Sequence, residues 1–76
     1  MNSNVVKSAN VALNRQANAA ANQYGTEVAT AIVASPNANA FAKNVRNAKN
    51  NYVSNMTSAY AKYTQKIANA RAKLGP

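Results

Sequence analysis

Residues 35–38 read Ser-Pro-Asn-Ala (SPNA), and this stretch decides how the rest of the chain is arranged. A residue that precedes proline avoids the helical backbone conformation, so a helix that arrives from the N-terminal side should end near Ala34. Ser35 can then cap a second helix with Pro36 at its first position, where proline lacks no needed amide hydrogen. The stretch therefore predicts a break between two helices.

Apolar residues recur on both sides of this break in steps of three, four and four, which is the spacing of one helix face. After the break the pattern repeats every eleven residues. The longest series are Phe41, Tyr52, Tyr63 and Leu74, and Val45, Met56 and Ile67. An eleven-residue period means about 3.67 residues per turn, close to a straight helix with a slight right-handed drift. We therefore predict long helices over about 4–34 and 38–74, with a turn at about 35–37.

So short a connection predicts that the two helices fold back on each other as one antiparallel hairpin over residues 1–76, an all-α fold. If the register follows directly from the turn, Glu27 lies opposite Val45 and can pair with Lys43 or Arg46. The predicted intramolecular core consists of Leu13, Tyr24, Val28, Phe41, Val45, Tyr52, Met56, Tyr63, Ile67 and Leu74. Seven of the eighteen positions in the two apolar stripes are alanine, which permits close helix approach but buries little area.

The chain is too short and too poor in large apolar residues to promise a stable core by itself. Ordering 76 residues costs about 110 kcal/mol at roughly 1.5 kcal/mol each, and offsetting this needs over about 4,000 Å² of buried apolar area. The sequence has no cysteine that could form a disulfide or a thiolate metal site. We therefore expect the hairpin to be a building block that packs with other copies of itself into a helical assembly.

The charge is strongly one-sided, with nine lysines and arginines against the single acid Glu27, and a net charge of +8. Residues 43–51, KNVRNAKNN, show the bias at its clearest, with three cations, four asparagines and no acid. This balance indicates a polyanionic partner. Six cations toward the open end of the hairpin are the predicted phosphate contacts: Lys7, Arg15, Lys62, Lys66, Arg71 and Lys73. A secondary set lies nearer the turn: Lys43, Arg46 and Lys49.

A polar row steps by four along the first helix: Asn10, Asn14, Asn18, Asn22, Thr26 and Thr30. Solvated helix faces usually carry Glu, Lys and Gln, which favour the helix more than Asn or Thr does. Uncharged amides and hydroxyls suit a surface that must pair its polar groups with neighbouring molecules. The row is therefore the predicted subunit-packing face, with a plain solvated face as the alternative.

Catalytic chemistry lacks its usual residues here. The sequence has no His, Cys or Asp, so general acid/base pairs, nucleophile–base dyads and metal ligand sets cannot be assembled. We expect no enzyme activity, no metal and no cofactor. The longest uncharged stretch, residues 28–42, is interrupted by Pro36 and two asparagines, so we expect no membrane partner.

A basic, Ala/Asn-rich chain under 80 residues with two long helices joined at SPNA resembles the small major coat proteins of archaeal bacilliform double-stranded DNA viruses, the clavaviruses. The resemblance implies hairpins packed as a rod-shaped capsid around DNA, with basic residues lining its interior. It places the protein in the virion, with double-stranded DNA and many copies of itself as partners. Lys, Arg and Asn would then contact phosphate without reading bases.

Two other readings remain open. A subunit of a secretion needle or pilus-like filament is also a small helical hairpin, and Ser35-Pro36-Asn37 loosely fits its proline-containing turn. Against it stand the lack of tryptophan and an excess positive charge that a needle does not need. The other reading is a cationic, membrane-active peptide of the bacteriocin kind, which the alanine-rich stripes disfavour because they provide little bulk for insertion.

Overall fold

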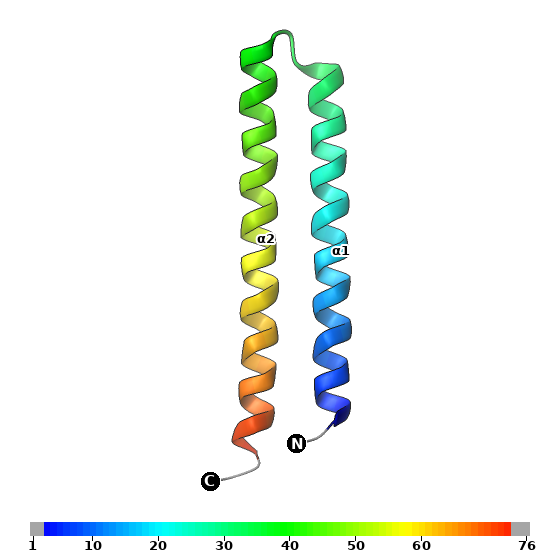
Figure 1. Ribbon diagram of the computed structural model, residues 1–76, viewed down its shortest axis with the longest axis vertical. Coiled ribbons are helices and arrows are strands. Elements are labelled where there is room, and N and C mark those ends of the chain that lie inside the picture. Colours follow the sequence, from blue (N-terminus) through cyan, green and yellow to red (C-terminus); the bar gives the residue numbers. More distant parts are fainter. Residues whose placement is uncertain (1–2, 74–76) are drawn as a thin grey trace.

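The computed structural model describes residues 3–73 and contains two long α-helices, α1 (Ser3–Ala34) and α2 (Ala38–Ala72). The helices run antiparallel and nearly straight, joined at one end by a short turn (Figure 1). The α-carbons span 59 × 18 × 8 Å, so the hairpin is a long, flat slab. The predicted all-α antiparallel hairpin is confirmed, although predicted core residue Leu74 lies outside the described part.

The turn differs from the prediction in its helix cap. α1 ends at Ala34 as expected, but α2 is capped by Asn37 and not by Ser35. The Asn37 side-chain oxygen accepts a hydrogen bond of 2.8 Å from the Ala40 amide. Ser35 instead belongs to the end of α1, because its amide donates to the Ala31 carbonyl at 3.0 Å. A cap must directly precede the first helical residue, and Pro36 lies before the helix and not within it.

Alanine forms the centre of the hairpin. The fully buried residues of the described part are six alanines, 1–6% exposed and spaced by eleven on each helix. On α1 and α2 respectively they are Ala9, Ala20 and Ala31, and Ala48, Ala59 and Ala70. We call these two facing rows the alanine seam. Their small side chains allow the two backbones to approach closely, at the expense of the buried area that larger side chains would provide.

The large residues predicted as core lie beside this seam. Leu13, Tyr24 and Val28 of α1 are half-buried, as are most of their counterparts on α2. Phe41 is 37% exposed and therefore lies at the surface. The hairpin thus has a narrow alanine core with a half-covered apolar margin.

The register also differs from the prediction. Glu27 accepts a hydrogen bond from Asn51, which lies six residues beyond Val45 in α2. The start of α2 accordingly projects beyond the end of α1 (Figure 1). Alanines of both rows come to the same grooves, Ala20 with Ala59 and Ala31 with Ala48, so the packing of the two helices, rather than the turn alone, sets how they align.

Candidate nucleic-acid interface

The alanine seam divides the hairpin into two long flanks of different chemistry. Large apolar side chains on one side of the seam form the apolar flank, which comprises Leu13, Tyr24, Val28, Val45, Tyr52, Met56, Tyr63 and Ile67. At its middle the rings of Tyr24 and Tyr52 meet across the helices, with centroids 5.7 Å apart and planes inclined by 56°. Amides, hydroxyls and charges on the other side form the polar flank, whose cross-helix contacts involve Gln23, Glu27, Asn51 and Asn55.

Hydrogen bonds connect the two helices on the polar flank. The Asn51 amide donates to a carboxylate oxygen of Glu27 at 2.9 Å, and the Gln23 amide donates to the other at 3.4 Å. Gln23 in turn accepts a bond of 3.3 Å from Asn55. The predicted pairing of Glu27 with Lys43 or Arg46 is wrong, because the shifted register brings Asn51 to the carboxylate instead.

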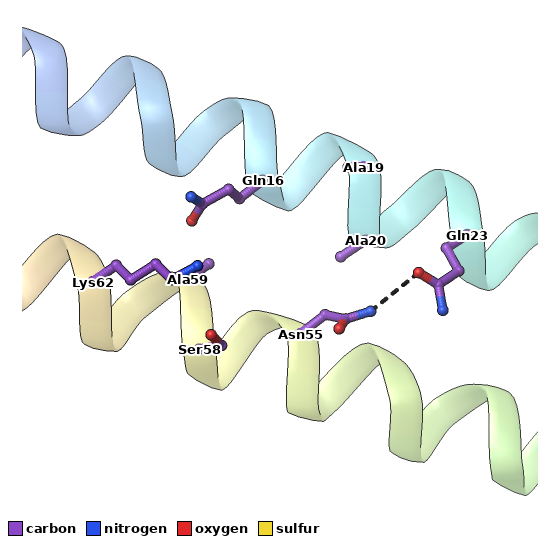
Figure 2. A pocket seen from close by; sticks show the side chains of 8 residues that line it. All are labelled: Gln16, Ala19, Ala20, Gln23, Asn55, Ser58, Ala59 and Lys62. Carbon is purple, nitrogen blue, oxygen red and sulfur yellow. Dashed lines mark hydrogen bonds between the residues drawn. The ribbon is translucent and has the colours of Figure 1, made fainter.

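A groove of about 290 Å³ lies at the middle of the polar flank, and we call it the middle groove. Figure 2 shows four residues of α1 facing four of α2 across it. Its floor contains Ala20 and Ala59 of the seam, and its walls carry donors such as Gln16, Ser58 and Lys62. A second groove of about 380 Å³, the turn groove, lies nearer the turn and contains Glu27.

The two grooves are related by the eleven-residue repeat. Adding eleven to the α1 residues of the middle groove and subtracting eleven from those of α2 yields all residues of the turn groove except Thr26. Gln16 thus corresponds to Glu27, and Asn55 to Asn44. One further step toward the open end leads to Val5 and Lys66 at these two positions.

All nine lysines and arginines have exposed side chains, and no charged group of the described part is buried. They do not share one face. Lys62 lines the middle groove, and the helical repeat places Lys66 and Lys73 along the same flank. Lys7 points away from α2, Arg15 occupies the position equivalent to Thr26 of the turn groove, and Arg71 stands at the outer edge of the apolar flank. The predicted open-end cations therefore lie near the same end of the hairpin but on different sides of it.

The secondary cations near the turn are divided in the same way. Helical spacing places Lys43 and Arg46 on the outer surface of α2 and Lys49 at the edge of the apolar flank. None of the three lines either groove.

The predicted packing row of α1 does not form a straight face. All six of its residues are exposed, from Asn10 to Thr30. Because each step of four residues advances about 40° around a helix, the row winds about 200° between its ends. It begins beside the apolar flank and finishes in the turn groove, where Thr26 and Thr30 are lining residues.

Several large apolar side chains remain uncovered in the isolated hairpin. Near the turn, Val33 is 88% exposed and Ile32 66%. Val11, Val53 and Tyr60 are also more than half exposed. Together with the half-buried apolar flank, they provide apolar surface that another molecule can cover.

The hydrogen-bonding residues of the polar flank were not predicted from sequence. Gln16, Gln23, Asn51 and Ser58 lie outside the apolar stripes and the row of steps of four, so neither pattern drew attention to them. A signal was present, because Asn44, Asn55 and Lys66 share the spacing of eleven that marks the apolar series. This spacing identifies a shared flank only once it is known which faces of the two helices pack together.

The chain matches no protein-family model, no curated protein and no solved structure. In the described residues, neither helix has a stretch long and apolar enough to span a membrane. The same residues contain no cluster of three or more His, Cys, Asp or Glu side chains suited to a metal ion.

Proposed function

We propose that this chain is the major coat protein of a virion. Many copies assemble helically into a rod-shaped capsid and package double-stranded DNA through contacts of Lys, Arg and Asn with phosphate that do not depend on base sequence. The observation that carries the proposal is that, within residues 3–73, the buried side chains are all alanine while nine cations are exposed. The resemblance in composition and layout to clavavirus coat proteins supports the same conclusion.

The exposed area favours self-association. The chain exposes 5508 Å², whereas a folded monomer of 8.0 kDa typically exposes about 4,450 Å². The excess, about 1,000 Å², is comparable to the roughly 800 Å² that one partner contributes to a standard protein interface. The apolar flank and exposed residues such as Ile32, Val33 and Val53 are the surfaces that neighbouring copies would cover.

The charge favours a polyanion within such an assembly. Packing many copies that each carry +8 side by side is costly unless a partner neutralises them. Duplex DNA carries one charge per about 1.7 Å of axis, so each subunit could neutralise roughly 14 Å of duplex. The single acid, Glu27, is already counted in this net charge.

Electron microscopy of native particles, combined with nuclease protection on the same sample, tests the proposal. We expect rods that contain protected DNA. Hollow filaments without nucleic acid would support a secretion needle or pilus-like filament instead. Monomers that leak lipid vesicles would support the membrane-active peptide and overturn the coat function.

A further inference from the structure

The polar flank is a series of three equivalent positions whose charge changes along the hairpin. The turn groove contains Glu27, and the middle groove has Gln16 at that place. Asn51 contacts α1 across the flank, and the equivalent residues toward the open end, eleven and twenty-two positions later, are Lys62 and Lys73. Each step away from the turn therefore makes the flank more positive.

A second series on α2 changes in the same direction. Asn44 lines the turn groove and Asn55 the middle groove, and the equivalent position toward the open end is Lys66. Counting the groups that face this flank, the turn groove has one acid, the middle groove one cation, and the open-end position two cations. Along this flank an anion is thus attracted more to the open half than to the turn groove, where Glu27 repels it.

We propose that the open half of the polar flank, from the middle groove to Lys73, is a track for the phosphodiester backbone of nucleic acid. This inference rests on the proposed DNA-packaging function and assigns it to one surface. Lys62, Lys66 and Lys73 neutralise successive phosphates along the track. Gln16 and Ser58 carry hydrogen-bond donors on the walls of the middle groove, and the alanine floor leaves room for the backbone to approach them.

The spacing of these positions supports a nucleic-acid backbone that runs lengthwise along the hairpin, rather than one that touches only its open end. Successive equivalent positions are eleven residues, or about 16.5 Å, apart along the hairpin. The long, flexible lysine side chains can cover the interval between them, since Lys66 lies four residues after Lys62 on nearly the same face. Lys7, which points away from this flank, is not part of the track, whereas Arg15 stands one repeat from Thr26 at the outer edge of the flank.

Two variants with equal loss of charge test the track. The first is Lys62→Gln/Lys66→Gln/Lys73→Gln, and the matched control is Lys43→Gln/Arg46→Gln/Lys49→Gln, whose sites lie outside both grooves. Binding of the full chain to a random-sequence DNA duplex is measured by fluorescence anisotropy over a range of salt concentrations. Far-UV circular dichroism and light scattering check that both variants keep the wild-type helicity and association state.

We expect the track variant to reduce the slope of log affinity against log salt by about 2.7, because each lost phosphate contact removes about 0.9. The control should reduce it by less than about 1. Equal reductions in both variants would overturn the track and leave the DNA-packaging function standing. A wild-type chain that binds no duplex would overturn both.

A third variant tests the repulsion at the turn groove. Glu27→Lys gives this groove a cation at the position that Gln16 occupies in the middle groove. It should lengthen the track and increase the slope by about 0.9. An unchanged slope would show that phosphate does not follow the flank in this direction, and would overturn the track as a continuous surface.

Discussion

The apolar flank and the polar flank follow the same eleven-residue repeat on the same two helices, yet they differ in what they contribute. Tyr52 and Asn51 are neighbours in the chain, and the first meets Tyr24 on the apolar flank while the second bonds Glu27 on the polar flank. Burial of apolar area stabilises a fold far more than exposed hydrogen bonds do. The apolar flank should therefore carry stability, and the polar flank should be free to serve binding.

The largest effect should come from the alanine seam that both flanks share. Ala59 is 2% exposed, so Ala59→Leu would force the helices apart and should cost about 3 kcal/mol of unfolding free energy. Ala61→Leu, on the exposed outer surface of the same helix, is the matched control and should change it by less than about 0.5 kcal/mol. Urea unfolding followed by circular dichroism measures both. Equal effects would show that the seam does not set the helix separation.

A somewhat smaller effect should follow from truncation on the apolar flank. Tyr52→Ala removes a half-buried ring and its contact with Tyr24, and should cost about 2 kcal/mol, roughly half the loss for a fully buried aromatic residue. Tyr60→Ala is the control, because Tyr60 is 55% exposed and should lose under about 1 kcal/mol in the isolated hairpin. A larger loss at Tyr60 would show that the exposed outer edge of the apolar flank, and not its half-buried part, carries the stability.

The turn allows the helix cap to be compared with a contact of the polar flank. Asn37→Ala removes the bond to the Ala40 amide and should destabilise the hairpin by about 1 kcal/mol. Ser35→Ala removes only the exposed bond from Asn44 and should cost under about 0.5 kcal/mol. Thermal unfolding of the two variants would distinguish them. A greater loss for Ser35 would restore the cap that the sequence predicted.

The smallest change should occur on the polar flank itself. Asn51→Ala loses an exposed hydrogen bond to Glu27 but gains helix propensity, so the two effects nearly cancel and the unfolding free energy should shift by less than about 0.5 kcal/mol. A loss above about 1.5 kcal/mol would mean that the polar network stabilises the hairpin as much as the apolar flank does, and would contradict the division of roles.

Much of the fold could be predicted from local signals. The apolar repeat identifies two long helices, and Pro36 fixes the end of the first at Ala34. The cap was predicted wrongly because both Ser35 and Asn37 are good capping residues, and the choice depends on where the backbone first becomes helical. Arg71 and Lys73 lie on different flanks, and this follows from their angles around α2 once the position of the alanine seam is known.

The sequence by itself determined the helices, the break between them and the excess of positive charge, because helix propensity, proline geometry and ionisation are properties of local residues. Only the tertiary structure decided which side chains face one another. It set Glu27 against Asn51, and it placed Gln16 and Lys62 around one groove. The reason is physical: the register depends on how the side chains of two complete helices pack against each other, and no single position determines it.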